Sequence, residues 1–204
     1  MAKTSAGNLN NNQTIIAQTW GVHENKMFQY GINILLMAVG VGVLSLSSRA
    51  TIMLDAVPIT MQTLAVLMIA FLYGSKLGAA TVAAWLGAGF LGAPVFALGA
   101  GSAYMFGPTG GYLAGFLVAS FIVGKLSDGG ASKNMVSVVF SMILGNIIIY
   151  AFGLAWLSGF LGLSAILFQK GLIPFLVGDA VKIIVATVGL PAIWSVADFI
   201  KKKL

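Results

Sequence analysis

Residues 173–199 read IPFLVGDAVKIIVATVGLPAIWSVADF, a run long and apolar enough to cross a membrane as a helix. Its only ionisable side chains before Asp198 are Asp179 and Lys182. Each costs roughly 2.5 to 3.5 kcal/mol to insert at the centre of a membrane helix, so such residues usually form a site or pair with another group. The spacing of three places them on one face, about 60° apart around the helix axis. That face offers either an ion pair that joins two helices or an acceptor and a donor for a small polar ligand.

The composition around this segment is that of an integral membrane protein. Hydrophobic residues make up 59% of the chain, charged residues 8%, and the mean hydropathy is +0.99. Charges separate long uncharged stretches, and a spanning helix needs about 20 mostly apolar residues. We therefore predict an all-α membrane bundle of six transmembrane helices as a substrate-binding domain, residues 27–204, after a polar extension, residues 1–26. The helices are predicted at about 28–47, 60–75, 77–91, 110–125, 134–157 and 173–199, the second and third joined tightly at Gly74, Ser75 and Lys76.

The basic residues predict the orientation of the bundle. With an even number of helices both termini lie on one side, and that side carries most of the 11 basic residues, while the other carries Arg49 and Lys170. Because basic residues are enriched in cytoplasmic loops, we place both termini in the cytoplasm and the chain in the cell membrane as a multi-pass protein. This bias also accounts for the net charge of +6, so no nucleic-acid partner is needed to explain it.

Two loops on the outer side are unusual for solvent-exposed linkers. One covers residues 47–63, and the other, residues 92–111, is rich in glycine, uncharged and contains Phe96, Tyr104 and Phe106. Irregular backbone at membrane depth is tolerated where it is buried in protein or lines a cavity. A flexible loop would not need three aromatic side chains, so we expect both loops to re-enter the bundle and cap a ligand pocket. Asp179 and Lys182 lie at the depth of that pocket, which favours a ligand-binding role over a purely structural one.

Other polar side chains in the helices have weaker signals, because each is also explained by hydrogen bonds between helices. They come in pairs, namely Gln62 and Thr63 at the start of the second helix, Thr109 and Tyr112 at the start of the fourth, and Asn146 and Tyr150 on one face of the fifth. In the first helix, Ala38 and Gly42 have the four-residue spacing of small residues that allows another helix to approach closely.

The chain lacks the residues that catalysis or energy coupling would need. It has no GxxxxGK[ST] phosphate loop, so ATP would have to be used by a partner. The single histidine, His23, lies in the polar extension, so neither a Ser-His site nor a His-metal site is expected inside the membrane. The chain has no cysteine. We therefore predict a protein that is not an enzyme and has neither a metal nor a cofactor of its own.

Three motifs together resemble the BioY family, the biotin-binding S components of energy-coupling factor (ECF) transporters. They are PITMQT at 58–63, GAPVFA at 92–97 followed by GPTGGY at 107–112, and Gly178-Asp179-x-x-Lys182. The resemblance covers residues 28–200 and implies six helices with cytoplasmic termini. It implies high-affinity capture of biotin from the outer side. The implied partners are a membrane coupling subunit and two cytosolic ATPase subunits, which use the ATP.

The resemblance also implies roles for individual residues. Asp179 and Lys182 correspond to the acidic and basic residues of the family motif and are expected to bind the ureido ring of biotin. With them, the predicted ligand-binding residues are Thr60, Gln62, Phe96, Thr109, Tyr112, Asn146 and Tyr150. The biotin carboxylate is left with two candidate partners, Arg49 or backbone N–H groups near Gly110 and Tyr112. Ala38 and Gly42 resemble the small-residue motif that contacts the coupling subunit, with glycine where alanine is more usual.

Three other interpretations stay open on the sequence alone. The chain could be an S component for a different vitamin, which competition binding would reveal. It could be a membrane subunit in which Asp179 and Lys182 form only a structural ion pair. It could be an enzyme only if a partner supplied the catalytic groups.

Overall fold

The structure is a computed structural model that describes residues 26–54, 56–97, 99 and 101–203. The described part is a helical bundle with one short β-hairpin. In chain order its elements are α2 (Lys26–Arg49), β1 (Thr51–Ile52), β2 (Ile59–Thr60), α3 (Gln62–Phe90), α4 (Ser102–Met105), α5 (Gly110–Asp128), the 3₁₀ helix η1 (Ala131–Lys133), α6 (Met135–Leu161), α7 (Ala165–Gly171) and α8 (Ile173–Lys203). The predicted polar extension lies outside the described residues except for Lys26.

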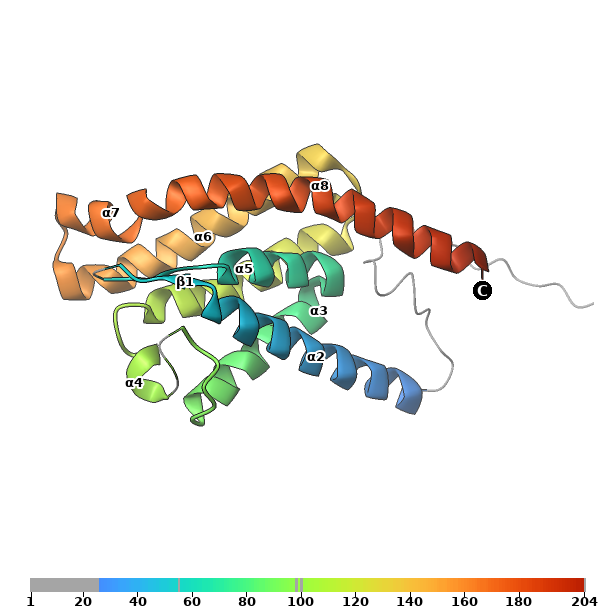
Figure 1. The fold of residues 1–204 in the computed structure, drawn as a ribbon, viewed down its shortest axis with the longest axis horizontal. Coiled ribbons are helices and arrows are strands. Elements are labelled where there is room, and N and C mark those ends of the chain that lie inside the picture. The colour runs from blue at the N-terminus through green and yellow to red at the C-terminus, as the bar shows by residue number, and fades with distance from the viewer. Residues whose placement is uncertain (1–25, 55, 98, 100, 204) are drawn as a thin grey trace, which may run out of the picture.

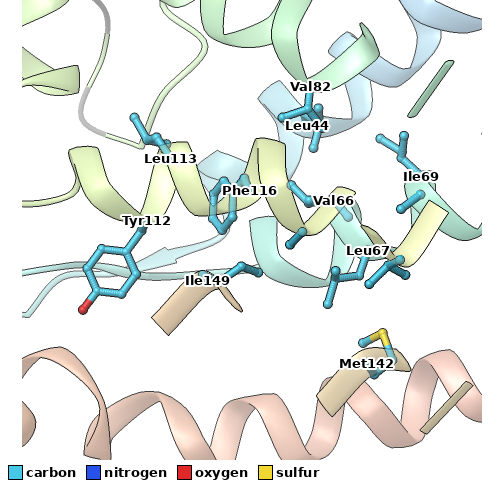
Figure 2. Packing of buried hydrophobic residues seen from close by; sticks show 14 of the residues in the cluster. Leu44, Val66, Leu67, Ile69, Val82, Tyr112, Leu113, Phe116, Met142 and Ile149 are labelled. Carbon is cyan, nitrogen blue, oxygen red and sulfur yellow. The ribbon is translucent and has the colours of Figure 1, made fainter. Parts of the chain in front are cut away.

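Five segments among the described residues are long and apolar enough to span a membrane, and they correspond to α2, α3, α5, α6 and the α7–α8 region. Helices α3 and α5 are the most deeply buried, whereas α2, α6 and α8 expose many large apolar side chains, as a bundle surrounded by lipid requires. Figure 2 shows the core between them, where Leu44 of α2 meets Val82 of α3 and where Tyr112, Phe116 and Ile149 lie along α5 and α6. The predicted membrane bundle is therefore present.

The predicted second and third helices are the two halves of α3, which meet at a kink without an intervening loop. The backbone departs from helical geometry at Gly74, whose φ of 78° and ψ of −177° belong to a region that only glycine adopts readily. The chain reverses there, since a Cβ atom at Gly78 would lie 3.3 Å from Ala70 Cα. In Figure 1 the two halves of α3 form a V. The two predicted helices are therefore present as the two halves of α3, and the reversal falls at the predicted join.

Side chains from α5 stabilise this bend. Asp128 Oδ2 accepts hydrogen bonds from Ser75 N at 3.2 Å and from Ser75 Oγ at 2.5 Å. Asp128 therefore acts as an N-cap for the second half of α3, although it comes from another helix. Gly124 lies so close that a Cβ atom there would be 2.6 Å from Ser75 Cα. The short helical halves of α3 are thus held together by contacts with α5.

The β-hairpin and α4 lie at one end of the bundle, and the two ends of the described chain lie at the other (Figure 1). We call residues 50–54 and 56–61 the strap; its strands pair antiparallel with Thr51 opposite Thr60. The hairpin is a small addition to the predicted all-α bundle and is too short to show the alternating pattern of a strand. Helix α7 was also not predicted. Both elements belong to the same end as α4, which is the end where the site lies.

Candidate ligand-binding site

The acid–base pair of the sequence is a buried ion pair on α8. Lys182 Nζ lies 3.1 Å from Asp179 Oδ1, and the exposed fractions of Asp179 and Lys182 are only 4% and 6%. Burying two charges is costly unless both are paired and hydrogen-bonded. The partners of each group therefore determine what the pair can do.

The ammonium group of Lys182 is fully occupied within the protein. Besides Asp179, it donates to the Thr60 carbonyl oxygen at 2.9 Å and to Thr63 Oγ1 at 2.7 Å. An ammonium group has three N–H donors, so three acceptors satisfy it. Lys182 thereby joins α8 to the last residue of β2 and to the first turn of α3.

The carboxylate of Asp179 connects α8 to α6 and to α3. Its Oδ2 accepts a hydrogen bond from the Tyr150 hydroxyl of α6, and its Oδ1 accepts a long one, 3.5 Å, from Thr63 Oγ1. The network therefore spans α3, α6 and α8. Thr63 contacts both charged residues, and the predicted ligand-binding set did not include it. Its position directly after Gln62 in the PITMQT motif was the available signal.

A cavity of about 40 Å³ lies beside this network, below the strap. Of the predicted ligand-binding residues, those that line it are Thr60, Gln62, Thr109, Tyr112, Tyr150 and Lys182. The other lining residues, which the prediction did not include, are Val57, Pro58, Thr63, Tyr104, Leu113, Phe116, Ile149 and Phe175. Typical pockets for small molecules measure about 300 to 1,000 Å³, so the cavity is much smaller than such a pocket.

Gln62 lines this cavity, and its side chain carries a buried donor that has no partner in the described part of the chain. Its side chain is 3% exposed, and Nε2 makes no hydrogen bond. Its Oε1 accepts from Thr60 Oγ1 at 3.1 Å, which fixes the orientation of the amide. A buried N–H group without a partner costs about 1 to 3 kcal/mol, so a ligand acceptor at this position would be favourable.

The loop residue Phe96 lies behind the cavity wall and not in it. Its ring is fully buried, stacks on Tyr104 at 5.1 Å between centroids and meets Trp85 edge-on at 5.1 Å. Tyr104 lies between Phe96 and the cavity, and burial raises the pKa of its phenol. Arg49 Nη2 donates to the Pro94 carbonyl oxygen at 2.5 Å, which joins the end of α2 to the same loop. A direct contact between Phe96 and a ligand stays a prediction.

Asn146 and Tyr150 share one face of α6, as their spacing predicts. Both line an apolar groove of about 510 Å³ between α6 and α8, which the buried Asp179 also lines. Only Tyr150 also lines the cavity. The structure therefore places Asn146 with Asp179 and Tyr150 along the groove, and neither Asn146 nor Asp179 lines the cavity below the strap.

The small residues of α2 lie on its outer face. Ala38 and Gly42 are exposed, and a Cβ atom at Gly42 would meet nothing within 4 Å. This surface is open to another helix, as the spacing predicts. Among the described residues, no group of three His, Cys, Asp or Glu side chains could hold a metal ion.

The comparisons with known proteins agree with this architecture. A profile described as the BioY family matches residues 22–199. The chain is 34% identical to "Biotin transporter BioY" of Thermotoga maritima, over 67% of this chain and 80% of that protein. It is 36% identical to the protein of the same name from Rhizobium etli, over 64% of this chain and 74% of that protein. A crystal structure of the S-component for biotin from an ECF-type ABC transporter has the same fold, with a TM-score of 0.71, 23% identity, and coverage of 84% of this chain and 94% of that one.

Proposed function

The chain belongs to the BioY family, and from this premise we propose that Asp179 and Lys182 bind the ureido ring of biotin in the cavity below the strap. The protein is the biotin-specific S component of an ECF-type ABC transporter and mediates biotin uptake. It is a binding subunit without catalytic activity of its own. We assign the site from one observation, the buried network in which the carboxylate of Asp179 and the ammonium group of Lys182 meet beside a cavity.

The chemistry of the pair matches the ureido ring. That ring carries two N–H donors and one carbonyl acceptor, so a carboxylate can accept from an N–H and an ammonium can donate to the carbonyl oxygen. Tyr150 supports this arrangement because its hydroxyl holds the second oxygen of Asp179. Thr63 supports it from the other side through Lys182.

The remaining walls suit the rest of the ligand. Leu113, Phe116 and Phe175 offer apolar surface for the bicyclic ring and the aliphatic chain. Gln62 Nε2 offers the donor without a partner for a further acceptor oxygen. For the carboxylate, the candidates remain Arg49 and the N–H groups at the start of α5, near Gly110 and Tyr112.

We propose that the bundle crosses the membrane six times, with each half of α3 crossing once and both termini in the cytoplasm. Support comes from the distribution of basic residues and from Figure 1, where the two ends of the described chain lie together, opposite the strap and α4. The strap and the loop before α5 then form the outer cover of the site. The exposed face around Ala38 and Gly42 is the proposed contact for the membrane coupling subunit, which would link this chain to two cytosolic ATPase subunits.

Binding of labelled biotin to the purified chain in detergent tests the proposed function. We expect tight binding that unlabelled biotin reverses and that other water-soluble vitamins do not reverse. The Thr187→Val variant serves as a matched control, because Thr187 lies on α8 and donates only to the Ile183 carbonyl within its own helix. Absence of binding by a folded parent, or equal competition by another vitamin, would contradict the assignment of biotin.

A further inference from the structure

The ring and the hydroxyl of Tyr112 face different parts of the molecule. The residue lines the cavity below the strap, whereas its hydroxyl donates a hydrogen bond of 2.7 Å to the Gly171 carbonyl oxygen. Figure 2 shows the ring projecting from α5, with the hydroxyl at the end farthest from that helix. A tyrosine hydroxyl has a single hydrogen, so this bond uses the one donor that Tyr112 has. The hydroxyl therefore acts on the protein backbone and not as a donor to a ligand.

The accepting carbonyl lies at the junction between α7 and α8. Gly171 is the last residue of α7, and α8 begins at Ile173. Carbonyl groups in the last turn of a helix have no donor within that helix and are usually satisfied by a cap or by water. Because Gly171 is buried, the Tyr112 hydroxyl takes the place that water has at an exposed helix end. The bond joins α5 to the point where the chain enters α8.

The Tyr112 ring fits a slot between two glycines. A Cβ atom at Gly153 of α6 would lie 2.4 Å from Tyr112 Cδ1, and a Cβ atom at Gly171 would lie 2.9 Å from the Tyr112 hydroxyl oxygen. Both distances are too short for a real Cβ contact, so only glycine leaves room for the ring at these two positions. The ring also packs against Phe175 in the first turn of α8, with 6.3 Å between centroids. Tyr112 is thus held against α6 and α7 and contacts the start of α8.

The same part of α8 carries the charged pair. Asp179 and Lys182 lie in its second and third turns, and Asp179 is only about 9 Å along the helix from Ile173 at about 1.5 Å per residue. The groups that bind a ligand must be held to within about 0.5 Å of the productive geometry. Over so short a length of helix, a shift of the α7–α8 junction displaces the carboxylate and the ammonium group with it.

We propose that Tyr112 is a positioning residue for biotin binding, because its hydroxyl fixes the α7–α8 junction and thereby the place of Asp179 and Lys182 beside the cavity. This inference rests on the proposed function, since it takes the pair to bind the ureido ring. Tyr112 then acts through α8 and not through a hydrogen bond from its hydroxyl to the ligand. Loss of the bond lowers the population of the binding-competent placement of α8, and the apparent Kd rises by the same factor.

A double-mutant cycle between Tyr112 and the charged pair tests this role. Tyr112→Phe keeps the ring and removes the bond, and one neutral hydrogen bond corresponds to about fivefold in an equilibrium constant. We expect Tyr112→Phe to bind labelled biotin about fivefold more weakly than the parent. In the variant Asp179→Asn combined with Lys182→Met, which has no charged pair to place, the same substitution should change affinity by less than about twofold. Tyr73→Phe is the matched control and should bind as the parent does, because its hydroxyl also donates to a backbone carbonyl, that of Leu36, but away from the site.

Hydrogen exchange, measured by mass spectrometry on the full chain in detergent without added biotin, gives a second readout. The amides of residues 171–178 should exchange about fivefold faster in Tyr112→Phe than in the parent, while those of α3 keep the parent rate. Gly153→Ala displaces the ring but keeps the hydroxyl, so it should loosen the same amides and weaken biotin binding. Gly159→Ala, also on α6, places a Cβ atom that meets nothing within 4 Å and should do neither.

Three results would overturn the positioning role while leaving biotin binding in place. The first is parent affinity in Tyr112→Phe. The second is an equal loss of affinity with and without the charged pair, which would indicate a direct contact between the hydroxyl and the ligand. The third is unchanged exchange at residues 171–178. A folded parent that binds no biotin would instead contradict the proposed function, and the exchange rates alone would then decide whether Tyr112 fixes the start of α8.

Discussion

Replacing Asp179 and Lys182 singly and together separates a ligand-binding pair from a structural one. Asp179→Asn and Lys182→Met each leave the partner charge buried without its counter-charge, at exposed fractions of 6% and 4%. Breaking a buried pair in this way costs about 3 to 5 kcal/mol of stability, whereas removing both charges is often close to neutral. We therefore expect both single variants to unfold at clearly lower temperature than the parent and the double variant to recover most of the loss.

Affinity for biotin should follow a different order. Asp179→Asn removes a charged acceptor for the ureido N–H, and hydrogen bonds to charged groups contribute about 1.5 to 3 kcal/mol. Each 1.4 kcal/mol is about a factor of ten, so binding should weaken between about tenfold and 150-fold. The double variant regains stability but has neither group, so its affinity should remain at least as low as that of Asp179→Asn.

The two orders are measured on the same preparations. Thermal unfolding in detergent gives stability, and equilibrium binding of labelled biotin gives affinity, with Thr187→Val as the matched variant on α8. A double variant that binds biotin as tightly as the parent would refute the reasoning, because the pair would then serve only to hold helices together.

Three further predictions address other parts of the molecule. Gln62→Met removes the donor without a partner and also the acceptor of Thr60 Oγ1, and these two effects oppose each other, so the melting temperature should change little. Biotin binding should weaken about fivefold, the effect of one neutral hydrogen bond of about 1 kcal/mol; stability and binding assays check both. Gly74→Ala places a residue with a side chain in a backbone conformation that costs of order 1 to 3 kcal/mol, so it should lower the unfolding temperature. Gly159→Ala is the control and should not lower it, because a Cβ atom at this position on α6 meets nothing within 4 Å. Gly42→Leu covers the small-residue face of α2, so biotin binding by the isolated chain should be unchanged. Co-purification with the ECF module should fall roughly tenfold, which corresponds to about 1.4 kcal/mol of contact energy. Equal recovery of the module would exclude this face as the contact.

The sequence predicted the long helices well, because hydropathy over about 20 residues is a property of the segment itself. The predicted 110–125 and 134–157 agree closely with Gly110–Asp128 and Met135–Leu161. It predicted the position of the bend in α3 but not that Asp128 of another helix holds it, nor the strap and α7, which are too short for periodicity to identify. Elements of that length are determined by tertiary contacts and not by local pattern.

The candidate site was predictable to a similar degree. Charge inside an apolar segment identified Asp179 and Lys182 without any structure, and their spacing predicted that they meet. Helical spacing could not separate Asn146 from Tyr150, because residues four apart share a face, and only the packing of the other helices determines that Tyr150 also lines the cavity. Thr63 was missed as a ligand-site residue because its role depends on a contact 119 residues away in the chain.

The pairing of Lys182 and Asp179 with each other also has a consequence for the thermodynamics of binding. Both ionised groups lose their hydration shells when the chain folds, so a ligand does not have to strip water from either of them. Each hydrogen bond that biotin forms with Lys182 replaces one that the protein already made, so such exchanges contribute little net free energy. Affinity then comes from the hydrogen bond to Asp179 and from the apolar surface that the ring and chain bury, and burial of that surface has a negative change in heat capacity as its calorimetric signature.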